Sequence, residues 1–127
     1  MPDFPSPESV AQRQLDAYNA HDVDALLATY TEDVQQFEFP VTLLCSGAAA
    51  LRERMTARLS DPLLHARLIN RIVMGNTVID HEEVTRTFPE GSGKIELVAI
   101  YEVRDGKIAA ARFISGKVTL ESTTHGP

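Results

Sequence analysis

The chain has little cysteine and no concentration of positive charge. Cys45 is the single cysteine among 127 residues. An internal disulfide is therefore excluded, and a lone thiol is typical of proteins in a reducing compartment. The net charge is −6, and lysines and arginines form no cluster along the sequence. Because binding to a phosphate backbone needs concentrated positive charge, nucleic acid is not expected as a partner.

Long apolar runs and targeting signals are also missing. No segment approaches the roughly 18 consecutive apolar residues of a membrane-spanning helix. The opening segment, MPDFPSPESV, lacks the charged and then apolar order of a secretory signal. We therefore expect a cytoplasmic protein with no membrane partner. The hydrophobic fraction of 43% suits one globular domain, with bounds 1–127, a core at about 8–116 and a polar tail at 117–127.

Capping residues and helical spacing predict helices in the first half of the chain. Ser6, which precedes a proline, is a typical N-cap, and Asp22 can cap a second helix after a break. A further helix is predicted to open at Ser46 or Gly47 and to run through Leu59. In the first helix a glutamine interrupts one apolar stripe, made of Val10, Ala11, Gln14, Leu15 and Tyr18.

Alternating apolar residues predict strands in the rest of the chain. The segments 94–104 and 107–115 form a hairpin, because Asp105-Gly106 between apolar runs is a strong turn signal. The segment 41–46 is predicted as an apolar connector. Further strands are expected at 34–39, 63–74 and 76–88. Helices followed by antiparallel strands indicate an α+β fold with the helices on one face of a curved sheet.

Each strand of the predicted hairpin has two distinct faces. Because side chains alternate along a strand, residues two apart share a face. In the first strand one face carries Ile95, Leu97, Ala99, Tyr101 and Val103. In the second, Ala109, Ala111, Phe113 and Ser115 face one way, and Ile108, Ala110, Arg112 and Ile114 face the other.

The pattern between Tyr18 and Gly47 is specific enough to suggest a family. Two short helices are separated by Asn-Ala-His-Asp, and Tyr-Thr-Glu-Asp, a strand and a glycine before another helix follow. This order of elements resembles that of the NTF2-like superfamily. This is the cone-shaped fold of ketosteroid isomerases, SnoaL-like polyketide cyclases and limonene epoxide hydrolases. The segments YEVRDGKIAAARFI and RIVMGNTVIDHEEVTRTF are similar to SnoaL-like proteins labelled as steroid-isomerase-related.

The resemblance carries expectations about architecture. It implies three N-terminal helices packed on a curved, mainly antiparallel β-sheet that encloses an apolar pocket. The other side of such a sheet commonly pairs with a second subunit, so a homodimer is expected. Since one fold hosts many reactions, the resemblance is far more specific for the fold than for the chemistry.

Glu38 is the candidate base. The resemblance places it where ketosteroid isomerases hold the carboxylate that moves a proton next to a carbonyl. It shares a strand face with Gln36, whereas Phe37 and Phe39 face the other way. A carboxylate in an apolar pocket has a raised pKa, which makes it a useful base near neutral pH. A solvated carboxylate on an edge strand is the alternative.

The other parts of the isomerase site are replaced in this chain. Ketosteroid isomerases hold the enolate with a tyrosine and a protonated aspartate, and the resemblance puts Gln14 and Ala99 at these positions. Losing one such donor costs about 10²–10³ in rate, so a true ketosteroid isomerase is not expected. Tyr101, Gln14 or Tyr18 could donate instead, although core packing is the alternative for both tyrosines. The candidate substrate-binding residues are Gln14, Tyr18, Gln36, Ala99, Phe113 and Ser115.

The densest ionisable run is Asp80-His81-Glu82-Glu83. On a strand Asp80 and Glu82 face one way and His81 and Glu83 the other, but the sequence leaves open which pair faces the pocket. In a pocket His81 could act as a general acid or second base. A solvated or dimer-facing strand is the alternative. The histidines have no ligand spacing, so no metal site is predicted.

Together these features predict a SnoaL-like enzyme that moves a proton on a small, mostly apolar carbonyl compound. Its catalytic candidates are Glu38, His81 and Tyr101, and no cofactor is expected. One alternative is a non-catalytic module that binds a small apolar ligand or serves as a dimeric interaction domain. Another is hydrolysis of an epoxide, which in this fold uses an Asp-Arg-Asp set to activate water.

Overall fold

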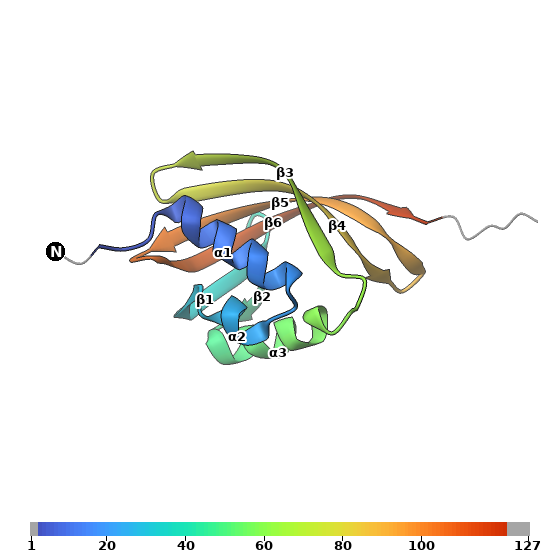
Figure 1. Cartoon of the computed structure of the whole chain (residues 1–127), viewed down its shortest axis with the longest axis horizontal. Helices are drawn as coiled ribbons and strands as arrows, with labels where there is room; N and C mark the ends of the chain where they lie inside the picture. Colours follow the sequence, from blue (N-terminus) through green and yellow to red (C-terminus); the bar gives the residue numbers. More distant parts are fainter. Residues whose placement is uncertain (1–2, 122–127) are drawn as a thin grey trace, which may run out of the picture.

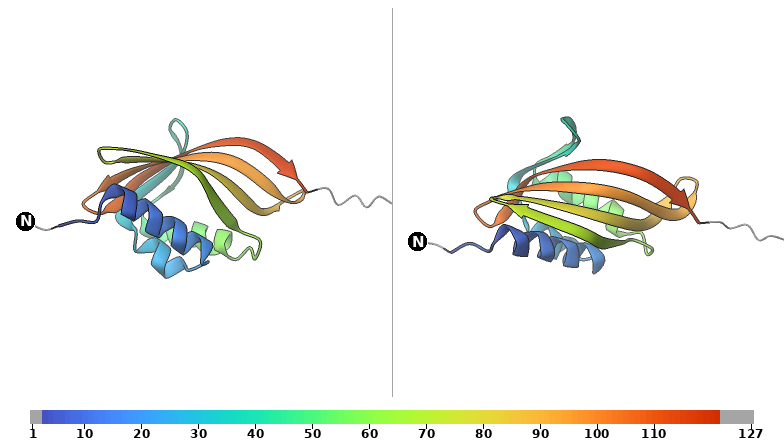
Figure 2. Two further views of the ribbon diagram at one scale, coloured as in Figure 1. Left: turned by 45° about the horizontal axis from the view of Figure 1, so that its top comes forward. Right: turned by 90° about the horizontal axis from the view of Figure 1, so that it is seen from above.

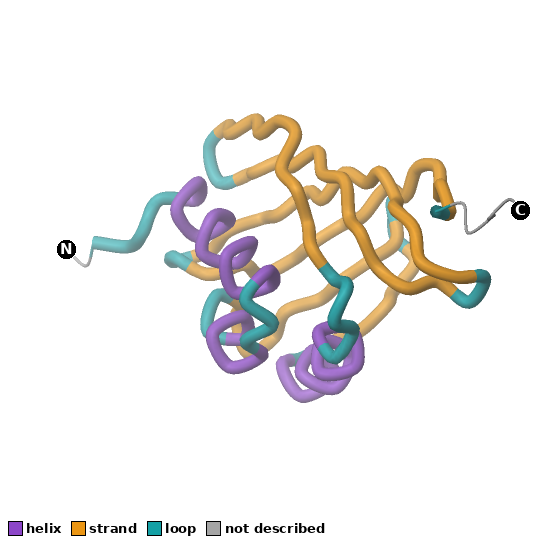
Figure 3. The backbone as a smooth tube through the Cα atoms, turned by 45° about the vertical axis from the view of Figure 1, so that its right-hand side comes forward, coloured by secondary structure: helices purple, strands orange, loops and turns teal. Residues whose placement is uncertain are grey.

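The computed structural model describes residues 3–121 and shows one curved sheet with helices on one side of it (Figure 1). The helices are α1 (Pro7–Asn19), α2 (Val23–Leu27) and α3 (Ala48–Leu59). The strands are β1 (Tyr30–Glu38), β2 (Thr42–Ser46), β3 (His65–Met74), β4 (Thr77–Phe88), β5 (Gly91–Arg104) and β6 (Lys107–Leu120). Figure 2 shows the sheet bending over the helices, and Figure 3 shows all the helical segments gathered on the same side of the strands.

The six-stranded sheet has the order β2-β1-β6-β5-β4-β3. β1 and β6 are parallel, and the other neighbours are antiparallel. The predicted α+β class with a curved, mainly antiparallel sheet is therefore confirmed. None of the helices within residues 3–121 is long and apolar enough to cross a bilayer.

The predicted helix starts are confirmed by their capping bonds. The Ser6 side chain accepts a hydrogen bond of 3.2 Å from the Ser9 N–H, and the Asp22 side chain accepts one of 3.0 Å from the Ala25 N–H. These bonds satisfy backbone donors that have no partner inside the helix. The expectation of three N-terminal helices holds only for α1 and α2, because α3 follows the β1–β2 hairpin.

The apolar connector predicted at 41–46 is instead a strand. β2 pairs antiparallel with the end of β1, from Ser46 opposite Gln35 to Thr42 opposite Glu38. Cys45 is the one residue of β2 that is buried, and its neighbours are exposed. An edge strand exposed on both faces has no alternation of apolar and polar residues, so the pattern that reveals strands was missing.

The hairpin of β5 and β6 follows the predicted turn but contains a bulge. The register shifts between Glu102 and Val103, so Ala110 lies opposite Glu102 whereas Ile108 lies opposite Val103. An extra residue in a strand reverses the facing of the residues beyond it. Ile108 is therefore fully buried in the core, like Ala111, instead of sharing a face with Ala110 and Arg112 as predicted. β6 also extends to Leu120, so 117–120 belong to the sheet, and the rest of the predicted tail beyond residue 121 lies outside the described residues.

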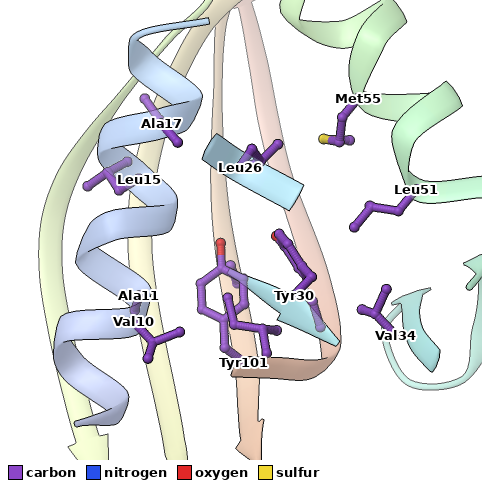
Figure 4. Close-up of a cluster of buried hydrophobic side chains, with 14 of the residues drawn as sticks. Val10, Ala11, Leu15, Ala17, Leu26, Tyr30, Val34, Leu51, Met55 and Tyr101 are labelled. Atoms are coloured by element: carbon purple, nitrogen blue, oxygen red, sulfur yellow. The ribbon is translucent and has the colours of Figure 1, made fainter. Parts of the chain in front are cut away.

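The core lies between the helices and the concave face of the sheet (Figure 4). α1 packs on β3 to β6, and α3 packs on β1 and β2. The largest fully buried apolar side chains are Leu26, Leu51 and Ile108. Burying each contributes about 1.5–3 kcal/mol. These contacts hold the helices away from one part of the sheet face and leave a cavity there.

Candidate active site

A cavity of about 240 Å³ lies between the concave sheet face and the helices α1 and α3. Every strand of the sheet contributes to its lining. Of the lining residues, Glu38, Leu44 and Ser115 are exposed, so the cavity opens to solvent on that side instead of being enclosed as expected. The remaining walls combine apolar side chains with a few polar groups, which is the usual composition of a small-molecule site.

Glu82 on β4 is the buried carboxyl group of this cavity. Its residue surface is 5% exposed, and no described residue donates a hydrogen bond to its side chain. Burial and, to a smaller extent, the charge of Asp80 raise the pKa of Glu82 to about 7, although the charge of Arg71 lowers it. Both protonation states are therefore populated near neutral pH, as a general acid or base requires.

The position of Glu82 follows from the pairing of β4 with its neighbours. β4 lies between β3 and β5, and Val78, Asp80, Glu82 and Val84 all point to the concave face. The sequence left open which pair of the charged run faces inward. The structure shows that it is Asp80 and Glu82.

Asp80 is held by a buried ion pair beneath the cavity lining. It is 0% exposed, and Arg71 on β3 donates to both of its oxygens, from Nε at 2.7 Å and from Nη2 at 3.0 Å. Arg71 also donates from Nη1 to Gln12 at 2.9 Å. A buried charge is tolerated when it is paired and hydrogen-bonded in this way. The pair fixes both charges near Glu82: the Asp80 carboxylate raises the pKa of Glu82, and the Arg71 guanidinium lowers it.

A chain of hydrogen bonds links two buried tyrosines through one glutamine. The Tyr101 hydroxyl donates to Gln14 Oε1 at 3.2 Å, and Gln14 Nε2 donates to the Tyr30 hydroxyl at 3.2 Å. Figure 4 shows both tyrosines on the sheet side of α1. Burial raises the pKa of Tyr30 and Tyr101, so both hydroxyls keep their protons near neutral pH. Since Tyr30 accepts from Gln14, its own proton remains available to a ligand in the cavity.

Most of the residues predicted from the sequence do meet at this cavity. Those in its lining are Glu38, Tyr101, Gln14, Tyr18, Gln36, Phe113 and Ser115. Whether they bind a substrate stays a prediction. Glu38 lies at the open side with an exposed side chain, so the buried carboxylate expected at this position is found at Glu82 instead.

Two predicted site residues lie away from the cavity. His81 is on the opposite sheet face, where its Nε2 atom lies 2.5 Å from Glu96 Oε2. The alternation along β4 that turns Glu82 inward turns His81 outward. Ala99 is fully buried and lies directly opposite Asp80 on the neighbouring strand, beneath the lining.

The sequence interpretation missed several polar lining residues. Tyr30, the first residue of β1, is one of them. Three arginines, Arg54, Arg58 and Arg86, also line the cavity. Arg54 and Arg58 are four positions apart and so share a helix face, which is the signal that could have revealed them. No group of metal-binding side chains occurs among residues 3–121.

A curved sheet that closes over helices around a cavity is typical of the NTF2-like class of α+β proteins. Within this class, the model of the SnoaL-like domain family matches residues 11–111. The chain therefore belongs to the SnoaL-like family. The resemblance inferred from the sequence motifs is thus confirmed.

Solved structures with the same fold include proteins of different activity. An uncharacterised cystatin-fold protein from Novosphingobium aromaticivorans is 25% identical, with a TM-score of 0.80, and the match covers 87% of this chain and 98% of that one. The epoxide hydrolase/cyclase-like enzyme SalBIII of salinomycin pyran ring formation is 20% identical (TM-score 0.77; 87% and 90% covered). An LEH-like epoxide hydrolase of M. tuberculosis is 14% identical (TM-score 0.77; 91% and 86% covered). No curated protein matches the chain.

Proposed function

We propose that this protein catalyses proton transfer on a small carbonyl compound, as in an isomerisation or cyclisation, with Glu82 as the base. The observation that carries the proposal is the burial of Glu82 in the cavity wall, with a pKa of about 7. A base of this pKa removes a proton at neutral pH and returns it in the next step. The reaction requires no cofactor.

The enolate formed by such a step needs a hydrogen-bond donor at its oxygen. Tyr30 supplies one, because its hydroxyl accepts from Gln14 and keeps its own proton for the ligand. Tyr101 holds the Gln14 amide in the required orientation. In this arrangement Tyr30 replaces the donor that the family places at the position of Gln14.

Glu38 has a secondary role in this proposal. It lines the exposed side of the cavity, where water competes for its carboxylate. The sequence-based assignment of Glu38 as the base remains the direct competitor of Glu82. Substituting each carboxylate separately distinguishes the two assignments.

Epoxide hydrolysis is the second candidate function. The buried ion pair of Arg71 and Asp80 beside Glu82 forms an acid–arginine–acid set, and two of the similar structures are described as epoxide hydrolases or as similar to them. In this reaction protonated Glu82 would donate its proton to the epoxide oxygen. Incorporation of ¹⁸O from labelled water into the product would identify this reaction, whereas isomerisation incorporates none.

The test of the leading proposal is exchange of carbon-bound hydrogen in D₂O. Cyclopentanone, cyclohexanone and 1-tetralone are incubated with the protein, and loss of the α-proton signal is followed by NMR. We expect exchange above the buffer rate with the wild type and with Glu38→Gln, and none with Glu82→Gln. Loss of exchange in Glu38→Gln alone would assign the base to Glu38. Saturable binding of these ketones without exchange would favour a binding module.

The outer face of the sheet supports a separate proposal that two copies form a dimer. Ile72 and Ile114 lie on this face and are 51% and 42% exposed. Between them the face also carries Ile79, Val98 and Ile100, which are partly buried. Light scattering of the wild type and of Ile114→Lys tests this, since a charge in the interface should shift the mass to that of one chain.

A further inference from the structure

Three arginines line the cavity from two different elements. Arg54 and Arg58 project from α3, and Arg86 projects from β4. Burial lowers the pKa of Arg54 and of Arg86, and the charge of Arg58 lowers both further. Each of these cations is therefore partly removed from water and is repelled by another. Such a cluster is unexpected in a chain with a net charge of −6.

No carboxylate among residues 3–121 forms an ion pair with these arginines. Other arginines of the chain do have such partners, for example Arg52 with Asp24 and Arg67 with Glu83. Arg54 instead donates to the neutral Gln36 amide at 3.4 Å. Within residues 3–121 the cluster is thus not neutralised by a direct ion pair, although the charge of Asp61 acts on Arg86.

Arg86 also lacks a dedicated carboxylate. Its guanidinium lies 4.2 Å from the centroid of the Phe88 ring and donates to the Thr87 carbonyl. The neighbouring Asp61 is bound elsewhere, since it accepts from the Thr87 N–H at 2.6 Å and from the Leu63 N–H at 3.0 Å. Asp61 therefore serves the backbone of these loops, and the Arg86 guanidinium stays available on the cavity side.

The arginine cluster and Glu82 occupy different parts of the cavity. On β4, Val84 lies between Glu82 and Arg86 on the face that lines the cavity, and Arg54 and Arg58 are on α3. The arginine that acts on Glu82 is Arg71, outside the cluster. One part of the cavity thus carries arginines without a direct ion pair, and another carries a carboxyl group with a pKa of about 7.

Partly desolvated like charges are unfavourable unless an anion joins them. We propose that the ligand of this cavity is an organic acid whose carboxylate is bound by Arg54, Arg58 and Arg86. The guanidinium fork matches a carboxylate in geometry and charge. The apolar part of the ligand then lies along Ile95 and Leu97 toward Glu82. Placing a reactive carbon at Glu82 rests on the proposed function, whereas binding of the carboxylate does not.

The test compares an acid with its neutral isostere by calorimetric titration. The probes are 1-naphthylacetate with 1-naphthylacetamide, and phenylacetate with phenylacetamide, at low salt. We expect the wild type to bind at least one acid about tenfold more tightly than its amide, since charge-assisted hydrogen bonds are worth about 1.5–3 kcal/mol. The preference should shrink as salt is added.

The matched variants are Arg58→Gln, Arg86→Gln and Arg13→Gln. We expect either cavity variant to weaken acid binding about tenfold and to leave amide binding unchanged. Arg13 is exposed on α1 outside the cavity lining, so its variant should bind both probes as the wild type does. Absence of an acid preference in both probe pairs, including absence of any binding, would overturn the proposal. An equal loss of acid and amide binding in the cavity variants would do the same.

The same titrations with Glu82→Gln separate this proposal from the proposed function. This variant should retain the acid preference, because Glu82 lies outside the arginine cluster. Retained preference with no hydrogen exchange in D₂O would support both proposals. If the variant retains the preference for the acid and also exchanges α-protons at the wild-type rate, the role of Glu82 as base is overturned. The carboxylate site would still be supported.

Discussion

Two glutamates line the same cavity in opposite environments. Glu38 lies at the exposed side on β1, where water surrounds its carboxylate. Glu82 lies on β4, is 5% exposed, and has the fixed charge of Asp80 beside it. The first position matches the base of ketosteroid isomerases by resemblance, and the second has the surroundings that a base requires. The comparison shows that two carboxyl groups in one lining differ in burial, and the proposal of Glu82 as the base rests on that difference.

The largest expected effect is on the reaction itself. Glu82→Gln should reduce α-proton exchange by about 10²–10⁴-fold, because it removes the group that accepts the proton. Glu38→Gln should change the rate by less than about tenfold. NMR exchange rates for both variants in D₂O measure the difference. Equal losses in the two variants would contradict the distinction between the buried and the exposed glutamate.

The second-largest expected effect is on the stability of the fold. It concerns Asp80, whose charge raises the pKa of Glu82. Asp80→Asn should lower the free energy of unfolding by about 3–5 kcal/mol, since it leaves the Arg71 guanidinium without its buried partner. Urea denaturation measures the change. The matched control is Asp24→Asn, which breaks an exposed ion pair with Arg52 and should leave stability unchanged within error.

The raised pKa of Glu82 also predicts how stability depends on pH. The pKa is about 7 in the folded protein against 4.5 for an unperturbed glutamate. Between these values the folded state holds a proton that the unfolded state releases. The free energy of unfolding should therefore fall as pH rises from about 4.5 to about 7, by at most about 3 kcal/mol from this group.

Glu82→Gln is the control for this pH dependence, because it lacks the titrating group. Its stability relative to the wild type should increase from pH 5 to pH 8 in urea denaturation. A constant difference over this range would show that Glu82 titrates at its ordinary pKa and would weaken its assignment as the base.

The smallest expected effect concerns the hydrogen-bond chain next to Glu82. Tyr30→Phe should slow α-proton exchange by about 10²-fold, because it removes the donor to the enolate oxygen. Tyr101→Phe should slow it less, since Gln14 still donates to Tyr30. Exchange rates at saturating ketone separate the two variants. A larger loss in Tyr101→Phe would make Tyr101 the donor, as predicted from the sequence.

Much of the fold could be predicted because its signals are local. Ser6 and Asp22 cap helices through bonds to residues three positions away, and Asp105-Gly106 forms the turn between β5 and β6. β2 and the inward face of Ile108 were missed. The first is an exposed edge strand with no alternation, and the second depends on a bulge that the apolar pattern does not reveal.

The candidate site could be predicted only in part. Gln14, Tyr101 and Gln36, which were predicted as site residues, line one cavity because they occupy inward positions of α1, β5 and β1. His81 was chosen from the charged run of β4, but the structure turns it to the outer face. A strand pattern with a period of two defines two faces without saying which one is covered.

The sequence by itself determined the α+β class, the family and the alternation that keeps Asp80 and Glu82 on one face, because these depend on neighbours along the chain. Only the tertiary structure decided that this face turns inward and that Glu82 is the buried carboxyl group of the cavity. It also decided that Arg54, Arg58 and Arg86 line one cavity without forming an ion pair with a carboxylate of the described residues. The burial of a side chain and the charges around it depend on segments that are far apart in sequence. They are therefore defined only when the helices have packed on the sheet.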